Sequence, residues 1–260
     1  MSDAALTYSS YLRVPELLEI QTPRSEEHDE LLFIIIHQTY ELWFKQLLHE
    51  FHHLNASLRD GDLHRALATG GRIRTIMKTL VSQVDILETM TPLQFNAFRS
   101  RLDAASGFQS AQFRAIEGLL GRRDRNFASH LTPEQQAEVG ALTSSPALWD
   151  HVLGHLAKRG HAVPSEVLHR DVSQPYDGDS RVVEVLVEVY RNDAEAGLLL
   201  ERLLDIDEGM QEWRYRHVKM VERTIGKKPG TGGSSAAAGY LLSTLFKPVF
   251  PDLWDARAQL

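Results

Sequence analysis

Helical periodicity constrains the fold of this chain more than any other feature. Apolar side chains recur at helical spacing almost throughout, and no useful length of sequence alternates apolar and polar residues as a half-buried strand does. The pattern predicts a helix from Ser25, as its N-cap, to about residue 58. At about 1.5 Å per residue this helix would be roughly 50 Å long, enough to run the length of a bundle. We therefore expect residues 1–260 to form one all-α, bundle-like domain with long core helices.

The remaining chain divides into further helices and a few irregular stretches. A second long helix is expected over 63–88, with Gly70 and Gly71 as a place for a bend. Shorter helices are expected over 92–102, 108–120, from Thr132 onward, and over 148–158, and a long one over 181–225 with a break near Asn192 and Asp193. Residues 161–179 are the least regular, and residues 228–235 form a glycine-rich loop.

Charge and composition exclude several classes of protein. Lys and Arg number 28 and Asp and Glu 35, a formal net charge of −7, so we expect no nucleic-acid partner. Cysteine is absent, which excludes disulfides, thiolate nucleophiles and thiolate metal sites. No signal peptide is recognised, and the longest aliphatic–aromatic run, 31–36, is far too short to cross a membrane. We expect a soluble, cytoplasmic protein without a membrane partner.

One short motif suggests zinc chemistry. Residues 49–53 read His-Glu-Phe-His-His and match H-E-x-x-H on a helix, in which two histidines share a zinc ion and the glutamate acts as a base. Neither the glycine–histidine extension nor a glutamate third ligand follows at the usual distance, so a solvated helix face is the preferred interpretation. The same interpretation applies to His151 and His155, which share the spacing.

Two other segments suggest ligand binding and have plain structural alternatives. Phe95, Arg99 and Leu102 lie on one helix face, where the arginine either grips a carboxylate or extends past core residues to solvent. The glycine-rich loop matches no nucleotide-binding motif and follows a helix. It either folds over an anionic or zwitterionic ligand or is a linker.

Two histidines lie among aromatic residues. His217 follows Trp213 by one helical turn in a segment rich in Arg and Lys, an arrangement that suits a haem, RNA or a structural histidine. His37 ends the run Phe33-Ile34-Ile35-Ile36 and is either a buried structural histidine or a donor in a ligand pocket.

These segments occur together and in order in a known family, so that the whole chain resembles the tryptophan 2,3-dioxygenases. The residues that carry the resemblance are Tyr8 to Leu12, His28 to Gln38, Tyr40 to Lys45, Leu87 to Pro92, Phe95 to Arg99, Ala105 to Ser110, Trp213 to His217 and Lys228 to Ser235. One departure is Ala236 to Ala238, where the family usually continues with glycine, and this difference bears on how the loop closes.

The resemblance implies an all-α enzyme that uses O2 to open L-tryptophan to N-formyl-L-kynurenine, the first step of tryptophan degradation by the kynurenine pathway. It implies one haem b per subunit, held in the bundle, and a homotetramer built as a dimer of dimers. His217 corresponds to the axial ligand of the haem iron, with Trp213 and Ser106 also at the haem, and His37 corresponds to the catalytic histidine.

The resemblance also implies a substrate pocket. Its residues correspond to Phe33, Ile34, Ile35, Ile36, His37, Phe95, Arg99, Leu102 and Thr231, with Tyr8 and Tyr11 from a neighbouring subunit. Arg99 would bind the substrate carboxylate, loop 228–235 would lie over the active site, and the N-terminal arm, about 1–24, would contact the neighbour. A haem-based sensor, a zinc hydrolase and a purely structural bundle remain as alternatives.

Overall fold

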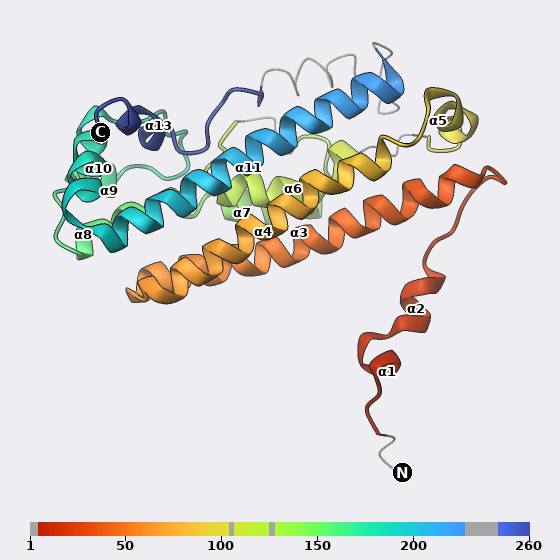
Figure 1. Ribbon diagram of the computed structural model, residues 1–260, viewed down its shortest axis with the longest axis horizontal. Helices are drawn as coiled ribbons and strands as arrows, with labels where there is room; N and C mark the ends of the chain where they lie inside the picture. Colours follow the sequence, from red (N-terminus) through yellow and green to blue (C-terminus); the bar gives the residue numbers. More distant parts are fainter. Residues whose placement is uncertain (1–4, 104–106, 125–127, 227–243) are drawn as a thin grey trace.

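Three long helices that lie side by side form the body of the molecule (Figure 1). The computed structural model describes residues 5–103, 107–124, 128–226 and 244–260, and every regular element in these ranges is a helix. Helix α4 (Leu63–Leu87) packs against both α3 (His28–Asp60) and α11 (Ala194–Ile225). The prediction of an all-α bundle is confirmed.

Shorter helices cover the ends and one side of this body. They are α1 (Tyr8–Leu12), α2 (Val14–Glu19), α5 (Pro92–Arg99), the 3-10 helix η1 (Gly107–Gln109), α6 (Ala111–Leu119), α7 (Pro133–Thr143), α8 (Leu148–Lys158), α9 (Ser165–Leu168), α10 (Ser180–Asn192) and α13 (Pro251–Arg257). Figure 1 shows α5 at one end of the long helices, α8 to α10 and α13 at the other, and α1 and α2 projecting away from the bundle. No described helix combines the length and apolar character needed to cross a membrane.

The reversal between α3 and α4 follows from two local signals in the sequence. Gly61 ends α3 with φ of +79°, a left-handed conformation that glycine adopts without steric cost. The carboxylate of Asp62 then accepts a hydrogen bond of 2.9 Å from the Arg65 amide and caps α4. Adjacent residues thus stop one helix and start the next, which makes the two helices antiparallel neighbours.

Two details of the predicted helices are wrong, each because a local side-chain hydrogen bond replaces the expected cap or helix turn. Helix α3 begins at His28, and Ser25 does not cap it; the Ser25 amide and hydroxyl both donate to the buried carboxylate of Glu30. The helix expected over 108–120 is divided, because the Ser110 hydroxyl accepts from the Phe113 amide and begins α6 there. Gly70, the predicted place for a bend, lies within α4, and an added Cβ there would lie 3.4 Å from the Arg202 side chain of α11.

The predicted break in the last long pattern is confirmed. Helix α10 ends at Asn192, and the carboxylate of Asp193 accepts a hydrogen bond of 3.1 Å from the Ala196 amide to begin α11. The same carboxylate receives two hydrogen bonds of 2.8 Å from the Arg159 guanidinium, from the end of α8. This corner fixes the direction in which α11 runs back along α4.

Candidate functional site

A pocket lies between α3 and α11, toward the end of the bundle that carries α5. About 710 Å³ within it is not filled by protein atoms, and part of this space is open to solvent. Helix α4 and the η1–α6 segment contribute its other walls. The described lining residues are His37, Tyr40, Glu41, Phe44, Val84, Leu87, Gly107, Ser110, Phe113, Arg114, Trp213, His217 and Met220.

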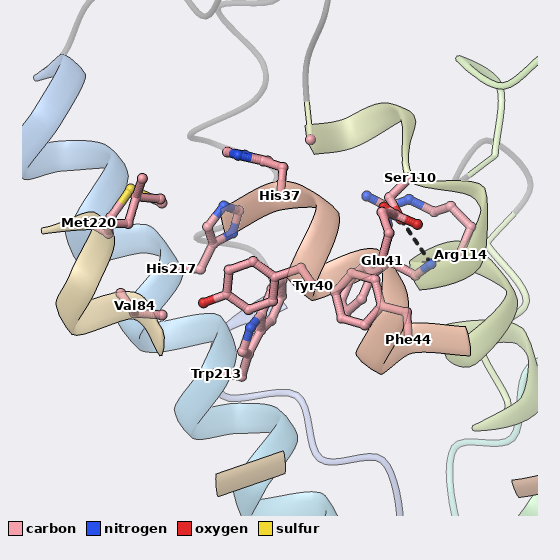
Figure 2. Close-up of a pocket in the computed structure, with 13 residues that line it drawn as sticks. His37, Tyr40, Glu41, Phe44, Val84, Ser110, Arg114, Trp213, His217 and Met220 are labelled. Atoms are coloured by element: carbon pink, nitrogen blue, oxygen red, sulfur yellow. Dashed lines mark hydrogen bonds between the residues drawn. The ribbon is translucent and has the colours of Figure 1, made fainter. Parts of the chain in front are cut away.

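Both histidines singled out from the sequence line this pocket. His37 comes from α3 and His217 from α11, and Figure 2 shows their side chains directed toward the same space. They are separated by 180 positions in the chain, so no local pattern brings them together. The packing of α4 against both long helices is what places the two imidazoles in one pocket.

The imidazole of His217 has the properties of a metal ligand. Burial lowers its pKa to about 4, and the nearby His37 and the Arg114 charge act in the same direction, so the ring is neutral at pH 7. Its Nδ1 atom is buried and has no hydrogen-bond partner in the described part of the chain. Metal coordination requires a neutral imidazole. A buried ring nitrogen left without a partner is also costly unless something else binds it.

The tautomer of His37 is set by its own helix. Nδ1 lies 2.7 Å from the carbonyl oxygen of Phe33, which can only accept, so Nδ1 carries the proton and donates. Burial lowers the pKa of His37, against the hydrogen bond to Phe33 and the charge of Glu41, and favours the neutral ring. The remaining nitrogen, Nε2, is therefore a hydrogen-bond acceptor.

Aromatic side chains fix the orientation of His217. Trp213, one turn earlier on α11, stacks on its ring with centroids 5.0 Å apart at 25°. Trp213 is held in turn by Phe113 of α6 at 4.6 Å and by Phe44 of α3 at 6.3 Å. Three helices thus determine the position of one indole, and the indole determines the plane of the imidazole beside it.

The wall opposite His217 is polar. Arg114 and Ser110 of α6 and Glu41 of α3 lie there (Figure 2). The Gln112 side chain holds Glu41, because its amide nitrogen donates to both the backbone carbonyl and the carboxylate of Glu41, each at 2.8 Å. The pocket therefore has a neutral, aromatic side around His217 and a charged side around Arg114.

The other predicted pocket residues on α3 do not line the described pocket. Ile36 is buried in a cluster with Leu87, Met90, Phe95 and Phe98, and Phe33 packs against that cluster. Phe33 lies 5.8 Å from Phe95 and 5.6 Å from Phe98 between ring centroids. Ile34 is half-buried, and Ile35 is 45% exposed on the outside of the helix.

The predicted carboxylate-binding residues lie just beyond this pocket. Phe95 is buried on α5, while Arg99 at the end of α5 and Leu102 after it are half-buried. Phe33 links the two regions, because its ring lies 4.1 Å from the His37 ring and also contacts Phe95. The structure thus connects Phe95 of α5 to His37 through Phe33, and Arg99 lies one helical turn after Phe95 on α5.

Four of the predicted residues cannot be placed against the pocket. Ser106, Thr231 and the whole of loop 228–235 lie outside the described residues, as do Ala236 to Ala238. Tyr8 and Tyr11 are 79% and 70% exposed on α1, which with α2 buries no residue against the rest of its own chain. The arm therefore presents both tyrosines away from the pocket of the same chain.

Several pocket residues were not predicted as site residues, although a signal for some of them is present. Tyr40, Glu41 and Phe44 follow His37 at three, four and seven residues, and Met220 follows His217 at three. Residues at these spacings lie on the same helix face, so these neighbours of the two histidines could have been predicted from the sequence as pocket residues. Ser110 and Arg114 carry no such signal, because they reach the pocket only through the packing of α6.

The zinc motif on α3 is divided between two faces of the helix. His49 and His53 are exposed, whereas Glu50 is buried and receives two hydrogen bonds of 3.1 Å from Arg72 of α4. Among the described residues, no group of three or more His, Asp or Glu side chains is arranged to hold a metal ion. Glu50 therefore joins two helices and does not face the two exposed histidines.

The basic segment of α11 is largely neutralised within the chain. Arg216 contacts Asp85 at 2.5 Å and Glu88 at 3.2 Å on α4, and Lys219 contacts Glu222 at 2.9 Å. The Arg216 pairs cross from α11 to the C-terminal end of α4 beside the pocket, whereas the Lys219–Glu222 pair lies within α11. Arg216 is thus part of the helix–helix contact and not a free cation.

Comparisons with known proteins show the family to which the chain belongs. A sequence profile described as tryptophan 2,3-dioxygenase matches residues 1–139 and 184–260. A protein of that name from Anaeromyxobacter sp. (strain K) is 58% identical over 259 residues, 99% of this chain and 97% of its own length. Proteins of the same name from Herpetosiphon aurantiacus and Caulobacter vibrioides are 56% and 46% identical, each across 98% of this chain and 99% and 98% of their own lengths. The chain therefore belongs to the tryptophan 2,3-dioxygenase family.

Proposed function

We propose that this chain is a tryptophan 2,3-dioxygenase, which inserts both atoms of O2 across the indole C2–C3 bond of L-tryptophan and yields N-formyl-L-kynurenine. The observation that carries the proposal is the pocket between α3 and α11, where two neutral imidazoles face the same space and one of them has a buried nitrogen without a partner. The family membership supplies the reaction.

The residues around His217 fit a haem. The neutral imidazole of His217 would serve as a ligand to haem iron, the aromatic and aliphatic wall would suit the porphyrin face, and Arg114 would offer a positive charge to a carboxylate. In this proposal His217 binds the iron of haem b, one per subunit, and Trp213 keeps the imidazole in the ligating orientation. When bound, haem supplies the reducible iron centre that activates dioxygen for insertion into an organic substrate.

Two side chains would orient the substrate. Arg99 binds the tryptophan carboxylate, since a guanidinium matches a carboxylate with two parallel hydrogen bonds. His37 would accept a hydrogen bond from the indole N–H through Nε2. Its Nδ1–H already donates a hydrogen bond to the Phe33 carbonyl, which leaves Nε2 as the acceptor. Phe33 and Phe95 would form the apolar wall between them. Much of the rate acceleration would then come from positioning.

The proposal includes Thr231 and loop 228–235 as a cover over the substrate, and Ser106 near the haem. It also includes a homotetramer in which Tyr8 and Tyr11 reach the pocket of a neighbouring subunit. The exposed apolar side chains of the arm support this, because residues such as Leu6, Leu18 and Ile20 are 75%, 70% and 56% exposed and find no cover in their own chain.

The test is an absorption spectrum of the purified, haem-supplemented protein, reduced under CO, with and without L-tryptophan. We expect the spectrum of a histidine-ligated haem, a shift when tryptophan is added, and formation of N-formyl-L-kynurenine under O2. His155→Ala is a matched control, because His155 is a buried histidine on α8 outside the pocket. A haem spectrum that does not respond to tryptophan would indicate a sensor, and a protein without haem would overturn the proposal.

A further inference from the structure

A cluster of buried charges lies directly behind the polar wall of the pocket. Glu117 of α6 is 3% exposed and forms ion pairs with Arg114, on the same helix, and with Arg122 at 2.7 Å. A third guanidinium, that of Arg214, lies 3.6 Å from the same carboxylate. One buried carboxylate is thus shared by three arginines, and the first of them, Arg114, lines the pocket.

This cluster joins three parts of the chain. Arg114 and Glu117 belong to α6, whereas Arg214 belongs to α11 and precedes His217 by three residues. Arg214 also donates hydrogen bonds to the carbonyl oxygens of Thr244, at 3.4 Å, and Lys247, at 3.2 Å. The carboxylate of Glu117 therefore lies where the pocket wall, the helix of His217 and the C-terminal segment meet.

Buried charges of this kind are held in place by their partners. A guanidinium that is 3% exposed, as Arg114 is, has little water to solvate it and depends on the groups around it. Its position relative to the pocket is consequently set by Glu117, which receives its hydrogen bond at one carboxylate oxygen while Arg122 occupies the other. Glu117 itself does not line the pocket.

We propose that Glu117 is a positioning residue for the pocket: it holds the Arg114 guanidinium in place for an anionic group of the bound cofactor and, through Arg214, keeps α6 fixed to α11 beside His217. The inference rests on the proposed function, in which the cofactor is haem and its anionic groups are carboxylates. It assigns a role in haem retention to a residue that does not line the described pocket.

The experiment measures the rate at which haem leaves the holoenzyme for an excess of apomyoglobin, at 25 °C and below the melting temperature of every variant. We expect Glu117→Gln to raise this rate about tenfold, the change that follows when a charge-assisted hydrogen bond is weakened. Glu50→Gln is the control, because Glu50 is also a buried, arginine-paired carboxylate but lies outside the pocket. Its rate of haem loss should equal that of the wild type.

A double-mutant cycle separates positioning from general stability. If Glu117 acts mainly through Arg114, the variant carrying both Glu117→Gln and Arg114→Gln loses haem faster than Arg114→Gln alone by no more than the increase that Arg214→Gln gives by itself. Arg214→Gln leaves the Glu117–Arg114 pair intact and should give a smaller increase. Additive effects in the cycle, or a wild-type rate in Glu117→Gln, would overturn the inference.

Two further arms keep the test decisive. If Glu117→Gln does not fold, Glu117→Asp takes its place, because it keeps the charge but moves it back by one methylene. We expect its rate of haem loss to lie between the wild-type rate and the rate of Arg114→Gln. A wild-type rate would overturn the inference. A wild-type protein that binds no haem would overturn the proposed function together with this inference, whereas haem binding with unchanged loss from the Glu117 variants would overturn this inference alone.

Discussion

Two polar side chains on α11, ten residues apart, have opposite surroundings. Asp207 is fully buried, and its carboxylate accepts hydrogen bonds of 2.9 Å from the amides of Val249 and Phe250 and from the side chains of Trp254 and Gln211. His217 lies in the pocket, and its buried Nδ1 finds no partner in the described chain.

The difference shows how one helix serves two purposes. Near α13, the Asp207 carboxylate is fully hydrogen-bonded within the protein, and these bonds hold the C-terminal segment against the bundle. Asp252 does the same from the other side, since it accepts from Trp149, Tyr176 and the Asp179 amide. Near α5, the buried Nδ1 of His217 lacks such a partner in the described chain and belongs to a residue that lines the pocket. A fully hydrogen-bonded carboxylate such as that of Asp207 serves the architecture, whereas His217 combines an unpartnered nitrogen with a place in a pocket.

The strongest test of this comparison is His217→Ala. We expect haem content and tryptophan turnover to fall by more than about 100-fold, because loss of a first ligand should exceed the effect of losing its outer partners. Far-UV circular dichroism should stay unchanged, since the imidazole contributes little to helix packing. Haem content per subunit, from the absorption spectrum, is the measurement, and a wild-type ferrous–CO spectrum would contradict the assignment.

Asp207→Ala should lower the stability of the fold and leave haem binding intact, the reverse of what we expect for His217→Ala. It leaves buried donors without an acceptor, at about 1–3 kcal/mol each, so the free energy of unfolding should fall by on the order of 3 kcal/mol or more. Urea denaturation measures this, with Glu208→Ala as the control, because Glu208 is the next residue and is exposed. The folded fraction should still bind haem. A stability equal to that of the control would mean that the hydrogen bonds of Asp207 do not hold the C-terminal segment.

Arg99→Ala extends the comparison to the edge of the pocket. Loss of a charge-assisted pair with the substrate carboxylate, about 1.5–3 kcal/mol, should raise KM for L-tryptophan by roughly 10- to 100-fold while haem stays bound. Arg101→Ala, two residues away and exposed, is the control. Steady-state kinetics give the answer, and normal KM and kcat for Arg99→Ala would exclude the carboxylate role.

The smallest expected effect is a pH dependence at the corner between α10 and α11. The hydrogen bonds from Arg159 hold the pKa of Asp193 well below its usual range. Its carboxylate therefore contributes stability above about pH 4, where an unfolded aspartate is already ionised, and this contribution is lost as the pH falls below that value.

Asp193→Asn should accordingly lower the free energy of unfolding by about 1–2 kcal/mol at pH 7 and by a smaller amount near pH 3, because the contribution falls progressively between the unfolded-state pKa and the lower folded-state pKa. Urea unfolding at the two pH values measures the difference. Glu195→Gln is the control, because Glu195 pairs with the same arginine but is exposed. An equal loss at both pH values would show that the ion pair is not the cause. Haem binding should be unaffected, since the corner lies at the far end of the bundle.

The sequence by itself determined what depends on neighbours along the chain. Helical spacing, the glycine stop at Gly61, the Thr91 and Thr132 caps and the break at Asp193 are all local, and the helices agree with them. The pairing of Trp213 with His217 is local too, since one helical turn separates them. The start of α3 was misjudged because Glu30 takes the Ser25 side chain, a contact that the cap pattern does not contain.

Only the tertiary structure decided which residues meet across the chain. His37 and His217 share a pocket because α4 packs against both of their helices, and Arg114 enters it because Glu117 and the packing of α6 hold it there. Asp207 could not be recognised as a structural carboxylate, since three of its four donors lie more than 40 residues away in the C-terminal segment. The physical reason is that the spacing of apolar residues determines which face of a helix is buried. Which other helix covers that face depends on the packing of all the helices at once and on the hydrogen bonds that the buried polar groups need.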